Sequence, residues 1–216
     1  MRLNRAAATL AAVLLLAGCT GGSASTTAPA SGASADLSSC PTSQPAAMPA
    51  GTSKLVTIVT AKGTIVIKVE GALSPIAAGN FVALAQCGYY TNVVFHRLMP
   101  GFVIQAGDGK YGRKPNLDMT NVGTGGPGYT IKDETVTGSY TRGTVAMAKT
   151  SRPNSADSQF FIVLADNQLD PSYQIFGHVT SGMDAVDAIA AMPNAGGQNG
   201  TALQPVAMDK VTVSNP

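Results

Sequence analysis

Short runs of β-branched and apolar residues dominate the chain from residue 54 onward. Two of them, Leu55–Thr60 and Thr64–Val69, are separated by three residues, which is the spacing of a β-hairpin. Similar runs predict strands at residues 93–97, 102–107, 143–149, 159–164, 174–179 and 210–213. This pattern predicts a mainly β fold.

Two segments have the pattern of a helix instead. Ser74 offers an N-cap, and Pro75 suits the first helical position. Apolar residues then follow to Gln86, and Gly88 ends the segment. Residues 182–192 form a second, shorter helical pattern. Many strands with two helices favour a closed antiparallel barrel that the helices cap.

The first 18 residues have the pattern of an export signal. Arg2 and Arg5 precede a mainly apolar run of eleven residues, which is too short to cross a bilayer as a permanent helix. The segment ends in Leu16-Ala17-Gly18-Cys19, which resembles the bacterial lipobox. This resemblance implies cleavage before Cys19 and lipidation of its thiol, hence an extracytoplasmic protein anchored to the bacterial cell membrane. The alternative is an ordinary secretory signal that contains a cysteine.

Residues 19–52 read as the lipidated cysteine followed by a flexible linker. Ser, Thr, Ala, Gly and Pro dominate this segment, with one acidic residue and no aromatic one. It therefore buries too little apolar surface to offset the entropy of ordering. A coil of this length would span roughly 30–35 Å. We expect the folded domain to occupy residues 53–216.

The charge pattern limits the classes of partner. Of the 14 basic residues, cleavage of the signal removes Arg2 and Arg5, which leaves 12 against 12 acidic residues. Without a basic patch, nucleic acid is excluded, and membrane attachment would come from the lipid. His96 and His178 lie far apart with no carboxylate at ligand spacing, so we expect no metal and no cofactor. We also expect a monomer.

Two cysteines remain once Cys19 is assigned to the lipid. In an oxidising compartment, Cys40 and Cys87 could form a disulfide that ties the end of the linker to the domain. Alternatively, Cys87 is buried and reduced while Cys40 is solvated. The spacing does not decide between these alternatives.

The segment from Phe95 to Asp108 carries the clearest chemical pattern. Read as strand, turn and strand, it can bring Arg97, Phe102 and Gln105 onto one concave patch, because side chains alternate across two faces. Residues 147–149 and 158–162 add Met-Ala-Lys and Ser-Gln-Phe-Phe-Ile. At these residues the chain resembles the cyclophilin family of peptidyl-prolyl cis-trans isomerases. The resemblance covers roughly residues 54–214 and implies a closed eight-stranded barrel.

The resemblance also implies a role for individual residues. Arg97 matches the catalytic arginine, Gln105 the residue that orients it and binds the substrate backbone, and Phe102 a residue of the proline pocket. The other implied substrate-binding positions are Val103, Gly123, Ala148, Lys149, Thr150, Gln159, Phe161, Leu169 and Tyr173. A guanidinium suits the isomerisation of a prolyl peptide bond, because it stays protonated and holds several hydrogen-bond donors rigidly.

Some positions depart from the family pattern. The chain has no tryptophan, Val103 stands where a methionine is common, and Lys149 where an asparagine is common. These departures bear on binding of the inhibitor cyclosporin more than on isomerisation. Residues 109–122 form an insertion relative to compact relatives, which is either a solvated loop or a surface that shapes partner choice.

The resemblance implies an isomerase that acts on proline-containing segments of exported, unfolded or partly folded polypeptides. A cyclophilin-fold binding module is the alternative from another class. Such a module would dock one exposed proline loop of an envelope protein and contribute little turnover.

Overall fold

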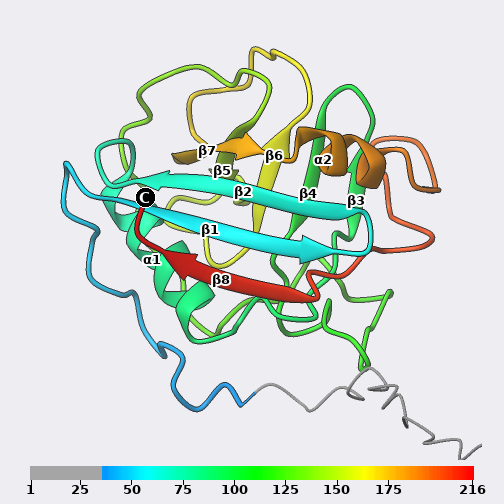
Figure 1. Ribbon diagram of the computed structural model, residues 1–216, viewed down its shortest axis with the longest axis horizontal. Helices are drawn as coiled ribbons and strands as arrows, with labels where there is room; N and C mark the ends of the chain where they lie inside the picture. The colour runs from blue at the N-terminus through cyan, green and yellow to red at the C-terminus, as the bar shows by residue number, and fades with distance from the viewer. Residues whose placement is uncertain (1–35) are drawn as a thin grey trace, which may run out of the picture. The chain divides into compact units, whose positions relative to one another are not determined.

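The computed structural model describes residues 36–216. Within this range it contains eight strands and two helices (Figure 1). In chain order these are β1 (Ser53–Thr60), β2 (Gly63–Glu70), α1 (Pro75–Gln86), β3 (Arg97–Met99), β4 (Val103–Ala106), β5 (Thr144–Met147), β6 (Phe160–Val163), β7 (Ile175–Ser181), α2 (Met183–Ala190) and β8 (Lys210–Ser214). The prediction of a mainly β chain with an N-terminal hairpin and two helices is confirmed.

All eight strands form one antiparallel sheet in the order β3-β4-β6-β5-β7-β2-β1-β8. The sheet curls strongly, so that β1, β2 and β8 pass in front of β3, β4 and β6 in Figure 1. The edge strands β3 and β8 are not paired with each other. The sheet is therefore an open half-barrel, and the prediction of a closed barrel is wrong.

Irregular backbone between the two edges explains why the sheet does not close. Residues 200–208 lead into β8 and meet the chain before β3 through isolated contacts, such as the 2.9 Å bond from the Phe95 N–H to the Val206 carbonyl. The Val94 N–H instead donates to the carbonyl of Gly112, at 2.8 Å. Because residues 93–96 bond to different segments in turn, the strand expected at 93–97 begins only at Arg97.

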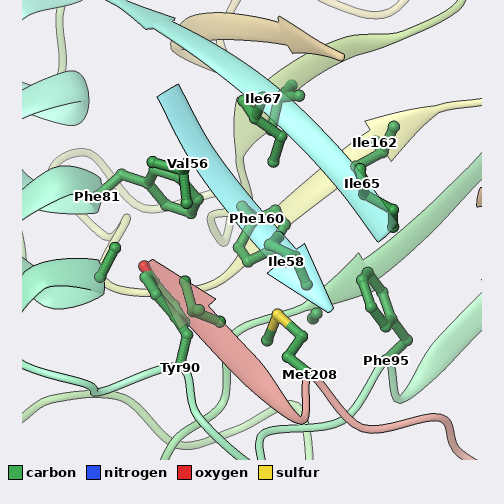
Figure 2. Packing of buried hydrophobic residues seen from close by; sticks show 14 of the residues in the cluster. Val56, Ile58, Ile65, Ile67, Phe81, Tyr90, Phe95, Phe160, Ile162 and Met208 are labelled. Atoms are coloured by element: carbon green, nitrogen blue, oxygen red, sulfur yellow. The ribbon is translucent and has the colours of Figure 1, made fainter. Parts of the chain in front are cut away.

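The main hydrophobic core lies inside the curl of the sheet (Figure 2). Branched side chains of β1 and β2 meet aromatic side chains of α1 and β6 there. None of the following is more than 1% exposed: Val56, Ile58, Ile65, Ile67, Phe81 and Phe160. The rings of Phe81 and Phe160 lie 5.1 Å apart at 76°, a favourable edge arrangement. Burial of this apolar surface is the main force that holds the sheet curled.

The opposite face of the sheet carries a second, smaller cluster. Successive side chains of a strand point to opposite faces. Phe160 therefore belongs to the main core, whereas Phe161 belongs to the second cluster. In the same way, Ile104 faces the main core and Val103 the second cluster. We call this second group the outer cluster. Its buried members are Val103, Tyr140, Ala146, Phe161, Val163 and Ile175.

The start of α1 differs in detail from the expected cap. Ser74 occupies the N-cap position, but its side chain makes no capping hydrogen bond, and its buried hydroxyl oxygen has no partner. The carboxylate of Glu134 caps the helix instead. It accepts the N–H groups of Ile76 and Ala77 at 2.8 and 3.0 Å. A carboxylate at this end also complements the helix dipole, and sequence spacing of 58 residues could not reveal it.

Residues 36–52 pack against the domain, although the flexible linker was expected to reach residue 52. Met48 is only 7% exposed, and its N–H donates to the Pro75 carbonyl at 2.8 Å. Cys40 is joined to Cys87 by a disulfide, which corresponds to the first of the two alternatives for these cysteines. The burial of Met48 and the disulfide of Cys40 anchor this segment to the domain, which its composition does not suggest.

The predicted signal peptide, Cys19 and the first part of the predicted linker lie outside the described residues. Within residues 36–216, neither helix is long and apolar enough to cross a membrane.

Candidate active site

Nine of the predicted site residues surround one cavity of about 180 Å³. They are Arg97, Phe102, Val103, Gln105, Ala148, Lys149, Phe161, Leu169 and Tyr173. We call this the proline cavity. Its apolar floor is the surface of the outer cluster, where the rings of Phe161 and Tyr173 lie 5.5 Å apart at 83°.

Strand register explains why residues far apart in sequence meet at this cavity. Arg97 on β3 lies opposite Gln105 on β4, which lies opposite Phe161 on β6. Opposite partners in a ladder share a face of the sheet. The next residue in this row, on β5, is the small Ala146, opposite Phe161.

A chain of side-chain hydrogen bonds holds Arg97 beside the cavity. Its Nη1 lies 3.4 Å from Oε1 of Gln105, and Nε2 of Gln105 donates to Oε1 of Gln159 at 3.0 Å. Gln159 in turn donates to the carbonyls of Gly123 and Gly125, both at 3.0 Å. The Nη2 of Arg97 donates to the Gln198 carbonyl at 3.2 Å.

Partial burial lowers the pKa of Arg97 from its usual value. An arginine nevertheless keeps its charge at neutral pH. The guanidinium is therefore a fixed cation beside an apolar cavity, with donors still available to a ligand.

The three remaining predicted residues, Gly123, Thr150 and Gln159, line an adjoining cavity of about 350 Å³. It shares Gln105, Ala148 and Lys149 with the proline cavity, so the two cavities are neighbours. The structure thus brings all twelve predicted positions into two neighbouring hollows. Their contact with substrate stays a prediction.

An ion pair with Asp133 restricts the side chain of Lys149. Its Nζ lies 2.6 Å from Oδ2 of Asp133, and its side chain is only 9% exposed. Asp133 also accepts the Asn154 N–H at 2.9 Å. The charge of Lys149 is thus compensated by a carboxylate of this chain.

Asp108 supports the site, although the sequence analysis gave it no role. Its carboxylate is fully buried and accepts four backbone N–H groups at 2.8–3.0 Å: those of Lys110, Tyr111, Gly123 and Gly125. It thereby joins both ends of the insertion beside the cavities. The signal available in the sequence was an acidic residue flanked by glycines at the end of an apolar strand.

His96 precedes Arg97 and is packed in the interior, as its apolar surroundings suggest. It is 5% exposed. Burial lowers its pKa to about 4, although the charge of Asp108 works in the opposite direction. Within residues 36–216, no three His, Cys, Asp or Glu side chains are grouped so that they could hold a metal ion.

Comparison with known proteins gives consistent results. Residues 55–213 match the family model described as cyclophilin type peptidyl-prolyl cis-trans isomerase/CLD. The probable peptidyl-prolyl cis-trans isomerase of Brucella abortus (strain 2308) is 39% identical over 154 residues, which cover 70% of this chain and 78% of that protein. Peptidyl-prolyl cis-trans isomerase B of Escherichia coli (strain K12) is 37% identical over 172 residues, which cover 74% of this chain and 99% of that protein.

A solved structure has the same fold. It is the crystal structure of a cyclophilin type peptidyl-prolyl cis-trans isomerase of Cryptosporidium parvum, with a TM-score of 0.65 and 30% identity. The alignment covers 76% of this chain and 99% of that chain. A second structure of that protein was determined in the presence of the dipeptide Ala-Pro.

Proposed function

Because this chain belongs to the cyclophilin type peptidyl-prolyl cis-trans isomerase family and is such an isomerase, we propose that Arg97 performs its catalysis over the proline cavity. The observation that carries the proposal is the guanidinium of Arg97, hydrogen bonded to Gln105 at the rim of a cavity that Phe102, Val103 and Phe161 also line. The alternative of a binding module with little turnover is not favoured, since the relatives are named as isomerases.

The reaction needs no bond cleavage. Resonance of the amide gives the prolyl bond a rotation barrier of about 18–20 kcal/mol. In the twisted state the nitrogen lone pair is localised and accepts a hydrogen bond. A donor already aimed at that nitrogen stabilises the twisted state more than either planar isomer, which is what lowers a barrier.

Each wall of the site has a part in this mechanism. Phe102, Phe161 and Val103 hold the proline ring by apolar contact, which leaves the bond to its nitrogen free to rotate. Arg97 donates to the twisted nitrogen, and Gln105 keeps the guanidinium in position. The Ala-Pro dipeptide used with the Cryptosporidium parvum relative supports a proline ligand for this cavity.

The test is an equilibrium exchange measurement by NMR on a proline peptide. Wild-type protein should exchange the two isomers far faster than the uncatalysed tens of seconds. Arg97→Ala should reduce kcat/KM on the order of 100-fold, because one preorganised donor is lost. Arg142→Ala, which removes an exposed arginine that lines neither site cavity, is the matched control and should exchange like wild type. Equal activity of Arg97→Ala and wild type would rule out this role for Arg97.

We also propose that the protein works outside the cytoplasm, held by a lipid on Cys19, on exported polypeptides that contain proline. The signal-like residues 1–18 support this location. So does the disulfide between Cys40 and Cys87, because such bonds persist in oxidising compartments. Membrane fractionation tests the proposal: wild type should sediment with membranes, whereas Cys19→Ala should not. Equal recovery of both in the soluble fraction would refute it.

A further inference from the structure

A third cavity, of about 290 Å³, borders Arg97 and Gln105. One wall comes from the end of the insertion, where Met119, Thr120 and Val122 lie. We call this hollow the flanking cavity. It is larger than the proline cavity, and the insertion supplies part of its lining.

The flanking cavity lies within reach of a bound substrate. It shares Arg97 and Gln105 with the proline cavity. An extended peptide advances about 3.3 Å per residue. A residue directly next to a proline that fills the proline cavity is therefore the one placed to reach the flanking cavity.

Hydrogen bonds hold the insertion wall in place before any ligand arrives. The Asp118 side chain accepts the Thr120 N–H at 2.9 Å, and the Asp118 carbonyl accepts the Val122 N–H at 2.9 Å. Asp108 fixes the next residue through the Gly123 N–H, at 2.8 Å. A preformed wall avoids the cost of ordering a loop when the substrate binds.

His96 and Gly123 both line this cavity. A Cβ atom at Gly123 would lie 3.4 Å from Nε2 of His96, at van der Waals contact with the ring. The φ angle of +93° at Gly123 disfavours any other residue there.

The charges of the lining limit what it can accept. Among its described residues, Arg97 alone is charged at neutral pH, because burial lowers the pKa of His96 to about 4. A lysine or arginine of the substrate would meet a like charge. A carboxylate would draw the guanidinium away from Gln105 and from the prolyl nitrogen. The apolar Met119 and Val122, together with the hydroxyl of Thr120, suit an uncharged side chain.

We propose that the flanking cavity is a substrate subsite that selects a medium-sized uncharged side chain, such as leucine or glutamine, next to the isomerised proline. This inference rests on the proposed function, since the proline must first occupy the neighbouring cavity. Met119, with 38% of its surface exposed at the rim, is the main specificity-determining residue.

The test uses two series of proline peptides and the full chain. One series varies the residue before proline and the other the residue after it, each with Gly, Leu, Gln, Lys and Glu. In one of the two series, kcat/KM for Leu and Gln should exceed that for Gly, Lys and Glu by about fivefold, a modest gain for a partly open pocket. Met119→Ala, which removes the wall, and Thr120→Trp, which fills the cavity, should bring the ratio of Leu to Gly close to one.

Asn116→Ala is the matched control, because Asn116 lies in the same insertion and lines none of the three cavities. It should keep the wild-type ratio. The subsite is refuted if wild type shows no preference in either series, if it favours Lys or Glu, or if both variants keep the preference. A wild-type protein that isomerises none of the peptides would instead refute the proposed function, and the subsite with it.

Discussion

The side chains of Gln105 and Gln159 are hydrogen bonded to each other at 3.0 Å, and only one orientation of the two amides is consistent with their surroundings. The carbonyls of Gly123 and Gly125 can only accept, so the amide nitrogen of Gln159 must face them. Its oxygen then faces Gln105, which must present its own nitrogen. The oxygen of Gln105 is thereby left for the guanidinium of Arg97.

Gln159 thus positions Arg97 without touching the reacting bond. Gln159→Leu should lower kcat about tenfold by loosening the guanidinium. Exchange spectroscopy over a range of peptide concentrations separates kcat from KM. Gln86→Leu, the same change at an exposed end of α1, is the control. Unchanged kcat in Gln159→Leu would mean that Gln105 holds Arg97 unaided.

Asp108 should be among the residues most important for stability in the region of the site. Asp108→Ala leaves four backbone N–H groups without their acceptor. We expect a loss of about 3 kcal/mol or more in the free energy of unfolding, because each unsatisfied buried donor costs about 1–3 kcal/mol. Urea denaturation of wild type and Asp108→Ala measures this loss. Asp166→Ala, which removes one exposed bond to the Arg142 N–H, should cost far less. Equal losses in both variants would contradict this account.

His96 should make stability depend on pH in a defined window. Burial lowers its pKa in the folded protein to about 4, whereas the unfolded chain has the ordinary value of 6.5. Below pH 6.5 the unfolded state takes up a proton that the folded state does not, so stability falls as pH drops from about 6.5 to 4. The loss attributable to this group is about 3 kcal/mol.

Urea denaturation at pH 7 and pH 4.5 provides the test. The variant His96→Gln should show a smaller difference between the two pH values than wild type does. His178→Gln removes the more exposed histidine, 3.7 Å from the carboxylate of Glu70, and is compared with wild type in the same way. If His96→Gln retains the full dependence on pH, other groups are responsible for it.

The disulfide should matter for stability and not for catalysis. Cys40 and Cys87 are 47 residues apart in the sequence. Closing a loop of this size stabilises a protein by about 4 kcal/mol in the chain-entropy treatment. The double variant Cys40→Ser/Cys87→Ser should lose stability of this order and keep wild-type kcat/KM, since neither cysteine lines the active-site cavities. Lost activity in a folded variant would contradict this separation.

Strand and helix positions followed closely from the sequence, because β-branched runs and a Ser-Pro helix start are local signals. The main exception was β3, since residues 93–96 pair with several segments that lie far apart in the chain. The prediction that the sheet closes into a barrel was wrong for the same reason. Whether two edges pair depends on tertiary geometry, which no local pattern reports.

The cavity residues were accessible through the family resemblance, and the positions of Arg97 and Gln105 also through strand alternation. The hydrogen-bond network that supports these residues could not be predicted from the sequence. The contacts from Gln159 to two glycine carbonyls, from Asp108 to the N–H groups of Gly123 and Gly125, and from Glu134 to α1 all join distant segments. Each is made by a polar residue whose sequence neighbours give no sign of its partner.

The placement of Phe160 and Phe161 on opposite faces has a consequence for how this protein can diverge. The outer cluster and the main core share the backbone of β4, β5 and β6 but not their side chains. Residues around the proline cavity can therefore change size without forcing the main core to repack. The shape of the cavity surface and the packing of the main core are thus specified by separate sets of side chains on the same three strands.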